Sequence, residues 1–407
     1  MKKLLAIILV MSMLFAMTAC GAGDGSDATA NDAGTDSTND AATDETDTSA
    51  GDETSASGEL KSFKLGMMDP LAWNATSGPL YAQMELAAKA LNAEIVYATF
   101  DANSAEGHIG AIQNMISSGC DAIILLNGPL IHGIIPQVAK MCDDAGVYWS
   151  LSWTKLLEDD PAYEAAMNSE YFVSTTYEDD VYSAYWVSSI LGNNESKNLA
   201  EIGFDPGNAT GDMRDEGIKK ACDEFGMKIL AEERDRAVTT SADGGKTIMD
   251  RFIAGYPEMD GIVIAGMSQY VLSGVVSAIE ENSLQDDVSV ACIDFHEFQT
   301  EYLESGILDG IIGGHVVGTF YSLILVANKI NGTPLTEEKM LIKDNFIEIT
   351  SYDDAVIWDE YGKPGRIYTE EEILNMMVVN NPDYSLDEFN KMVENYSLDD
   401  IVARNSK

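Results

Sequence analysis

The chain has 407 residues, and its 68 acidic side chains against 24 basic ones leave a formal net charge of −44 at pH 7. A surface this acidic repels phosphate groups, so we exclude nucleic acid and anionic lipid headgroups as binding partners. Net charge affects solubility and non-specific association with other molecules. It does not describe a local binding site, so it does not identify a ligand.

The first twenty residues have the pattern of a secretory signal. Lys2 and Lys3 precede an apolar run over residues 4–15, and small residues follow before Cys20. This run is too short to span a bilayer as a mature helix, which favours a leader that is removed after export. We therefore expect residues 1–19 to be a signal peptide and the protein to work outside the cytoplasm.

The cysteine that ends this segment resembles the last position of a bacterial lipobox. Thr18 and Ala19 directly precede Cys20, while Met17 stands where that motif usually has leucine. The resemblance implies cleavage before Cys20 and attachment of lipid to its thiol, so that the mature protein is anchored to the bacterial cell membrane. The alternative is an ordinary cleaved signal followed by an incidental cysteine.

Residues 21–58 are almost entirely small or polar and contain no aromatic or large aliphatic side chain. Such a segment buries too little apolar surface to offset the entropy of ordering it, so we expect it to be disordered. Its carboxylates have no basic neighbour and repel one another, which extends the chain. Residues 20–58 are therefore predicted to be a lipidated, acidic tether; a calcium-binding role is the alternative.

From residue 59 onward the chain alternates strand-like and helix-like stretches. Strands are expected at residues 63–68, 94–100, 122–127, 147–153, 171–175, 199–204, 227–231, 261–265, 288–293 and 308–313. Between them apolar side chains recur at helical spacing, as over residues 79–91 and 105–118. This regular alternation predicts an α/β fold.

Several of these strands are apolar on both faces, as in the run from Ala122 to Leu126. A strand of this kind suits a parallel sheet covered by helices on both sides. Because so many β–α units exceed one small sheet, we expect two doubly wound parallel-sheet lobes joined by a hinge of crossing strands. The first lobe is predicted over residues 59–176 and 313–343, and the second over residues 177–312 and 344–407.

Polar and aromatic residues follow the ends of the predicted strands. In doubly wound sheets, ligands bind outside the carboxyl ends of the strands, where the loops converge. An indole covers the apolar face of a sugar ring, while amides, carboxylates and a guanidinium bond its hydroxyl groups, so this mixture suits a neutral polyhydroxylated ligand. The candidate ligand-binding residues are Trp73, Asn74, Asn127, Trp153, Arg214, Gln269, Asp294 and His315.

A family resemblance is carried by residues 64–68, 112–124, 214–218 and 288–294. The second of these segments reads as a helix, a small turn and a D-A-I-I strand, the third as an R-x-x-G turn, and the fourth as a strand that ends in an aspartate. In this order they resemble type I periplasmic solute-binding proteins, in the ribose- and galactose-binding branch of sugar ABC transporters. The resemblance extends over residues 63–349 and implies a periplasmic binding protein-like fold and carbohydrate transport.

The resemblance also implies roles for individual positions. Arg214 matches the family's arginine, which would fork across two ligand oxygens, and Asp294 matches its acceptor for vicinal hydroxyl groups. In the loop after the first strand, Trp73 would stack on the ligand and Asn74 would bond it.

Four residues depart from the family's pattern. Ser152 and Trp153 stand where the family has an Asp–Arg pair, which removes two charges and adds a second stacking surface. Gln269 stands near the expected asparagine, and His315 stands near the expected glutamine. The site is therefore sugar-like in kind, while the particular sugar stays open.

Each candidate also has a purely structural explanation. Arg214 has acidic neighbours and suits a surface ion pair, while Asp294 suits the N-cap of a helix that begins near His296. The two tryptophans suit packing between lobes, and the asparagines suit turns. Gln269 and His315 suit space-filling positions at strand ends.

No catalytic motif is recognised in the sequence. Its four histidines lack the spacing of a zinc site, and it has neither a nucleophile elbow nor a phosphate-binding loop. We therefore expect no catalytic residues, no metal, no cofactor and no enzymatic activity. A glycan-acting enzyme at the cell surface is the alternative from a different class, because a catalytic carboxylate pair is hard to recognise in so acidic a chain.

The last residues exceed what this family fold usually needs. Two capping boxes, at Thr369–Glu372 and Ser385–Glu388, predict the starts of two helices. Phe389, Met392 and Val393 give the second helix an apolar face. We expect this helical extension to pack back onto a lobe; docking to a partner is the alternative.

Together these observations predict a monomeric binding protein that captures a small polyhydroxylated ligand, a sugar, as two lobes close around a hinge. The family resemblance implies that the closed form docks on an ABC transporter permease. The alternatives are a ligand sensor for a receptor kinase and a binder of nucleosides or of a furanosyl signal.

Overall fold

The computed structural model describes residues 59–68, 77–99, 104–126 and 131–406. The predicted signal peptide and tether lie outside these residues. The predicted functional residues that also lie outside them are Cys20, Trp73, Asn74 and Asn127.

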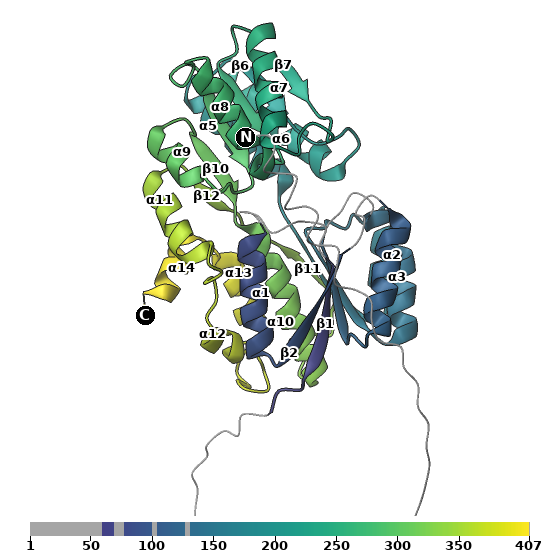
Figure 1. The fold of residues 1–407 in the computed structure, drawn as a ribbon. Helices are drawn as coiled ribbons and strands as arrows, with labels where there is room; N and C mark the ends of the chain where they lie inside the picture. The colour runs from purple at the N-terminus through teal and green to yellow at the C-terminus, as the bar shows by residue number, and fades with distance from the viewer. Residues whose placement is uncertain (1–58, 69–76, 100–103, 127–130, 407) are drawn as a thin grey trace, which may run out of the picture. The chain divides into compact units, whose positions relative to one another are not determined.

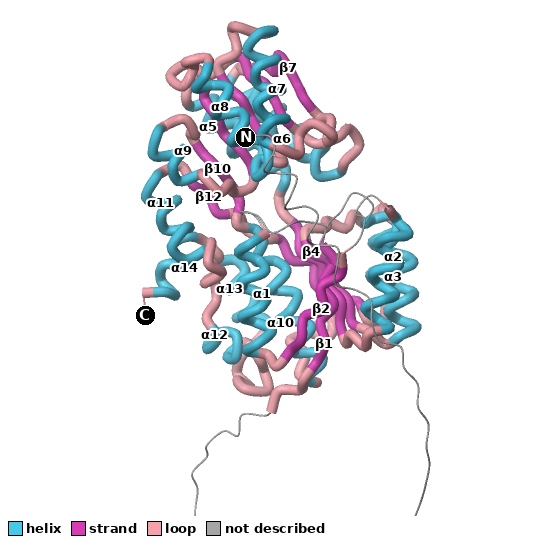
Figure 2. The backbone as a smooth tube through the Cα atoms, viewed as in Figure 1, coloured by secondary structure: helices cyan, strands magenta, loops and turns pink. Residues whose placement is uncertain are grey.

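The first sheet has six strands, all parallel. In spatial order they are β11 (Met340–Lys343), β5 (Phe172–Tyr177), β4 (Tyr148–Ser152), β3 (Ala122–Leu126), β1 (Phe63–Met68) and β2 (Ala93–Ala98). One face is covered by α1 (Gly78–Ala90) and α10 (Gly318–Asn331), and the other by α2 (Ala105–Ser117) and α3 (Ile131–Ala145), beside which α4 (Pro161–Asn168) lies (Figures 1 and 2).

The central strand β3 shows why this sheet needs helices on both sides. All five of its side chains are buried. Ala122, Ile124 and Leu126 belong to the core under α1 and α10, whereas Ile123 and Leu125 belong to the core under α2 and α3. Because successive side chains of a strand point to opposite faces, an uninterrupted apolar run fills two cores at once. Full burial of each Ile or Leu contributes about 1.5–3 kcal/mol to the free energy of unfolding.

The second sheet also has six strands, five parallel and one antiparallel. In spatial order they are β12 (Ile347–Ile349), which runs antiparallel, β10 (Gly310–Gly313), β9 (Ser289–Ile293), β8 (Gly261–Ile264), β6 (Asn198–Ile202) and β7 (Lys228–Glu233). Its helices are α5 (Asp180–Asn193) and α6 (Ala209–Phe225) on one face, and α7 (Ala242–Gly255) and α8 (Ser268–Glu281) on the other, with the short α9 (Gln299–Ser305) after β9.

Glycine allows the two helix pairs of this lobe to approach closely. A Cβ on Gly217 of α6 would lie 2.2 Å from the carbonyl oxygen of Val181 in α5. A Cβ on Gly274 of α8 would lie 1.8 Å from the carbonyl oxygen of Ala242 in α7. Both distances are shorter than any side chain tolerates, so these positions require glycine.

The chain passes between the two sheets three times. The first passage joins β5 to α5 and contains Glu178, the second joins β10 to α10 and contains His315, and the third joins β11 to β12 and contains Asp344. The predicted α/β architecture, with two doubly wound lobes and crossing segments between them, is confirmed.

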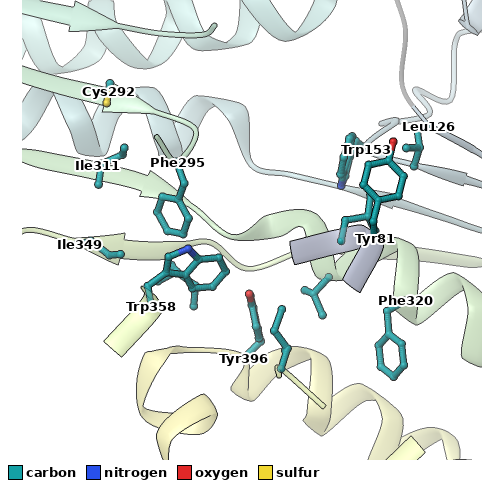
Figure 3. Close-up of a cluster of buried hydrophobic side chains, with 14 of the residues drawn as sticks. Tyr81, Leu126, Trp153, Cys292, Phe295, Ile311, Phe320, Ile349, Trp358 and Tyr396 are labelled. Carbon is teal, nitrogen blue, oxygen red and sulfur yellow. The ribbon is translucent and has the colours of Figure 1, made fainter. Parts of the chain in front are cut away.

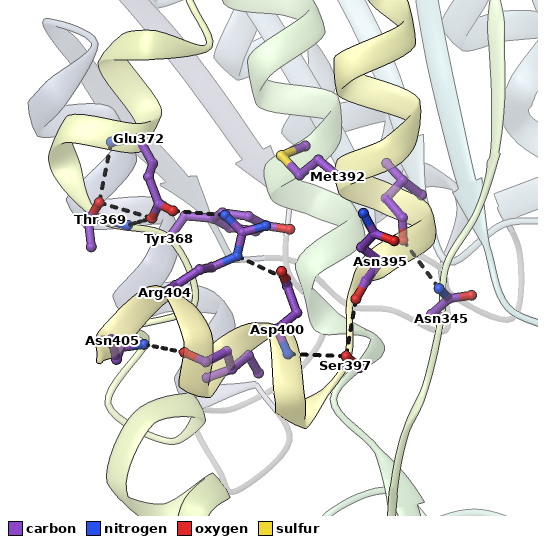
Figure 4. A network of polar contacts seen from close by, with 12 residues as sticks. Asn345, Tyr368, Thr369, Glu372, Met392, Asn395, Ser397, Asp400, Arg404 and Asn405 are labelled. Carbon is purple, nitrogen blue, oxygen red and sulfur yellow. Dashed lines mark hydrogen bonds and ion pairs between the residues drawn. The ribbon is translucent and has the colours of Figure 1, made fainter. Parts of the chain in front are cut away.

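A C-terminal helical extension follows the second sheet. Its elements are α11 (Tyr352–Ile357), one turn of π-helix (Trp358–Gly362), α12 (Glu370–Asn375), α13 (Leu386–Asn395) and α14 (Leu398–Asn405). Both predicted capping boxes are present, at the starts of α12 and α13. Figure 4 shows how α14 is tied to α12: Arg404 lies 2.8 Å from carboxylate oxygens of both Glu372 and Asp400.

The extension was grouped with the second lobe in the sequence analysis, but most of it packs on the first. Asn328 of α10 donates a hydrogen bond to the Met376 carbonyl, and Gln83 of α1 donates one to the Tyr368 carbonyl. The second lobe contacts the beginning of the extension, where Thr300 donates to Asp359 at 2.6 Å. Packing back onto the protein is therefore confirmed, whereas the assignment of the whole extension to the second lobe is wrong.

The extension also adds large side chains to the core next to the passages between the sheets. The rings of Phe295, after β9, and Trp358 lie 4.6 Å apart in an edge-to-face arrangement (Figure 3). The hydroxyl of Tyr396 donates a hydrogen bond of 2.6 Å to the carbonyl of Gly314, on the second passage. The extension is therefore held by a ring contact next to β9 and by a hydrogen bond to the second passage.

Within the described residues, no helix is both long enough and apolar enough to cross a membrane.

Candidate functional site

A cavity of about 310 Å³ lies where the strands of both sheets end. The residues that line it come from the loops after β4, β5 and β6 and from the helices next to them, so both lobes contribute. The lining residues used below are His132, Trp153, Lys155, Asp160, Glu178 and Asp180. The carboxyl ends of parallel strands are where doubly wound folds bind ligands.

Trp153 forms one wall of this cavity. It directly follows β4 and has a positive φ of 56°, a backbone conformation that is uncommon for a bulky residue. The side chain is 8% exposed, and its Nε1–H has no hydrogen-bond partner among the described residues. Its ring meets the ring of His315 edge-on, 5.8 Å away. An indole placed in this way offers a ligand both an apolar surface and a free donor.

Glu178 lies at the same cavity, on the first passage between the sheets. It is 7% exposed, and its Oε1 lies 3.2 Å from Nε2 of His315. Burial raises the pKa of this carboxyl group to about 7; Asp294 adds to the shift, whereas Arg214 opposes it. Glu178 therefore exchanges a proton near neutral pH.

His315 connects this carboxyl group to Asp294. Burial lowers the pKa of the imidazole, so the ring is neutral at pH 7. Its Nε2 lies 3.2 Å from Oε1 of Glu178 and 3.9 Å from Oδ1 of Asp294. Its Nδ1 has no partner among the described residues. The neutral imidazole thus lies between two carboxyl groups.

Arg214 is buried rather than part of a surface ion pair. Its Nε donates to Asp180 and its Nη1 donates to the carbonyl of Ala265, both at 2.8 Å. Burial lowers the pKa of the guanidinium, but the carboxylates of Asp180, Asp294 and Glu178 outweigh burial and raise it. Two of its nitrogens are therefore occupied within the protein, so the predicted fork across two ligand oxygens is not formed with these atoms.

Asp294 stands directly after β9 with a φ of 77°. It does not cap a helix, because α9 begins only at Gln299 and its N-cap, Phe298, makes no side-chain cap. The predicted helix N-cap at Asp294 is therefore wrong. The carboxyl group instead turns toward His315 and is 8% exposed.

Four predicted site residues thus come together: Trp153, Arg214, Asp294 and His315. Gln269 lies in the first turn of α8, and its buried Oε1 has no partner among the described residues. Its neighbour Ser268 donates a hydrogen bond to the carbonyl of Asp294.

Two acidic residues that the sequence analysis missed complete the cluster, Glu178 and Asp180. A signal for them existed, since Glu178, Asp179 and Asp180 are three consecutive acidic residues just after the predicted boundary between the lobes. Asp180 is 4% exposed, and its carboxylate holds Arg214. Consecutive carboxylates at a point where the chain changes lobes are more informative than the same residues on a helix surface.

Other sites find less support. In the part of the chain that the structure describes, no group of three or more His, Cys, Asp or Glu residues is arranged to hold a metal ion. A larger cavity of about 980 Å³ is lined by Glu59, Asn92 and residues of α12 and α14. Glu59 and Asn92 precede β1 and β2, so this cavity lies at the amino ends of the strands, opposite the edge where such sheets bind ligands.

The Arg214–Asp180 pair should be important for stability. Asp180→Ala leaves a buried guanidinium without its carboxylate, so we expect a loss of about 3–5 kcal/mol in the free energy of unfolding, measured by urea denaturation. Asp223→Ala is the matched control, because it breaks a solvent-exposed pair with Lys219 on α6, the helix that carries Arg214. It should cost less than about 1 kcal/mol, and equal costs for the two variants would contradict a buried pair at Arg214.

Stability should depend on pH through Glu178. A carboxyl group with a raised pKa keeps its proton in the folded state while it loses it in the unfolded state, so folding becomes less favourable as pH rises from about 4.5 to about 7. Glu178→Gln removes this effect. The variant should therefore gain stability over the original protein across that window, by up to about 3 kcal/mol, and the gain should level off above it. Thermal unfolding of both proteins at a series of pH values measures the difference in their stability. A difference that does not change with pH contradicts the prediction.

Comparisons with known proteins agree with this architecture. Residues 172–333 match the family model described as a periplasmic binding protein domain. No curated protein matches the sequence.

Three solved structures illustrate the likeness in fold. A periplasmic solute-binding protein of an ABC transporter from Actinobacillus succinogenes, with bound D-allose, is 20% identical with a TM-score of 0.61, and the match covers 71% of this chain and 98% of that one. One from Bacillus halodurans, with bound myo-inositol, is 20% identical with a TM-score of 0.59, covering 76% and 100%. A periplasmic sugar-binding protein from Pseudomonas fluorescens is 14% identical with a TM-score of 0.64, covering 84% and 99%.

Residues 172–333 thus match a periplasmic binding protein domain, and the two lobes have the fold of periplasmic solute-binding proteins of type I.

Proposed function

We propose that this protein is an extracytoplasmic solute-binding lipoprotein that captures a small polyhydroxylated solute, a sugar, between its two lobes and delivers it to an ABC permease. The observation that carries the proposal is the cavity at the strand ends, to which Trp153 of the first lobe and Asp180 of the second both contribute. A ligand held there contacts two lobes that are connected by three short passages of chain.

The chemistry of the cavity supports a polyhydroxylated solute. Trp153 provides an apolar face and an unpaired N–H, and Glu178 provides a carboxyl group that changes between donor and acceptor near neutral pH. Asp294 provides acceptor oxygens close by. Stacking on an aromatic ring combined with several hydrogen bonds is the recognition that a sugar ring requires.

Capture follows from the connection between the lobes. Contacts from both lobes exist at the same time only when the lobes are closed on the ligand, so binding shifts the protein toward that state. A permease that recognises the closed state then receives only loaded protein. Among proteins of this fold, the structures with bound D-allose and myo-inositol support a polyol as the ligand.

A ligand panel tests the binding function. We expect one sugar among pentoses, hexoses, furanoses, disaccharides and nucleosides to raise the unfolding temperature of the purified protein. At one hundred times its dissociation constant it should stabilise the folded state by about 2.7 kcal/mol, which is a shift of a few degrees. Asp294→Ala should abolish the shift, whereas Asp144→Ala, an exposed carboxylate on α3, should leave it intact. A shift only with nucleosides, or none at all, contradicts the sugar proposal.

Metabolic labelling tests the lipid anchor. Cells that express the protein and grow on labelled palmitate should incorporate the label, and Cys20→Ala should lose it and release the protein from the membrane fraction. Cys120→Ala is the control, because that thiol is buried in the first lobe and should not affect labelling. Incorporation that survives Cys20→Ala contradicts the lipobox.

A further inference from the structure

The cavity carries an unbalanced negative charge when Glu178 is ionised. Arg214 is the only Lys or Arg side chain that is buried among the described residues, and its Nε and Nη1 are bound to Asp180 and Ala265. One guanidinium therefore faces more than one carboxyl group. Buried charges in proteins are normally paired, so an unpaired carboxylate at a cavity indicates that its partner comes from the ligand.

Glu178 is the carboxyl group without a cation of its own. Its nearest partner is His315, and burial keeps that imidazole neutral. The ring lies 3.2 Å from Glu178 but provides no compensating charge. Titratable or charged groups face Glu178 from each element packed against it, and these are Asp180 on α5, Arg214 on α6, Asp294 after β9, His315 after β10 and Asp344 after β11.

The rim of the cavity does not reverse this balance. Lys155 is exposed, and its ammonium lies 5.9 Å from the centre of the Tyr177 ring. His132 is already paired with Asp160 at 2.8 Å. The field of the whole protein acts in the same direction, because a net charge of −44 attracts cations and repels anions.

We propose that the solute carries a positive charge, as an amino sugar or an amino polyol does, and that its ammonium group pairs with Glu178. The ring of Trp153 is the second element of this recognition, since an aromatic face attracts a cation as well as a sugar ring. This inference rests on the proposed function and narrows it: a neutral sugar fills the cavity without balancing its charge, and a sugar acid is repelled.

Matched ligands that differ only in charge test the proposal. Titration calorimetry on the purified protein would compare three hexose series, each consisting of the neutral sugar, its 2-amino derivative and its uronic acid. At about pH 7.5 we expect the amino sugar of one series to bind about tenfold more tightly than its neutral parent, since a hydrogen bond to a charged group is worth about 1.5–3 kcal/mol. The uronic acid should not bind.

Variants identify Glu178 as the source of the discrimination. Glu178→Gln should bring the ratio between amino and neutral sugar close to one. Glu201→Gln is the matched control, because Glu201 is an equally buried carboxyl group of the second lobe that pairs with Arg234 and does not line the cavity. This control should keep the ratio.

The pH dependence provides a second readout. Pairing with an ammonium group favours the ionised carboxyl group, so binding should release protons, and the affinity for the amino sugar should fall as pH is lowered from about 7.5 to about 5.5. A neutral sugar that binds more tightly than its amino derivative, or an amino sugar whose affinity rises at low pH, overturns the proposal while the proposed function stands. If no sugar of any charge binds, both fail.

Discussion

One buried guanidinium organises the functional region of this protein. Arg214 reaches from α6 to Asp180 and to the carbonyl after β8, and its charge also acts on Glu178 and Asp294. Without a cation at this point, several carboxyl groups could not be kept together away from water. The pair with Asp180 thus permits acidic side chains to stand at the cavity rather than serving the ligand directly.

Three buried ionisable groups of this region lie on the passages that connect the lobes. Glu178, His315 and Asp344 each belong to a different passage, and all three side chains are buried. Burial raises the pKa of Asp344 well above its usual range, and Glu178 adds to that shift. A cluster that is costly in one arrangement of the lobes favours another, which is how strain at a hinge is used in conformational change.

The architecture could be predicted from the sequence because its signals are local. The uninterrupted apolar run of β3 and the capping boxes at Thr369 and Ser385 depend only on neighbouring residues. The site was predicted only in part, since Trp153 and Asp294 follow strand ends, whereas Glu178 matters because of partners that are distant in sequence. Likewise, nothing near Tyr368 or Met376 in the sequence reveals that the extension bonds to α1 and α10.

Neither sheet is continuous along the chain, and this affects the order in which the protein can fold. The chain leaves the first sheet at Tyr177. The helix α10 and the edge strand β11, which complete that lobe, follow only after the helices and the parallel strands of the second lobe. Phe320 and Tyr321 of α10 are fully buried, so the first lobe exposes apolar surface until the ribosome has synthesised α10. Such non-local contacts slow folding and prevent the usual completion of domains in order of synthesis. The chain must therefore be nearly complete before its first half becomes stable.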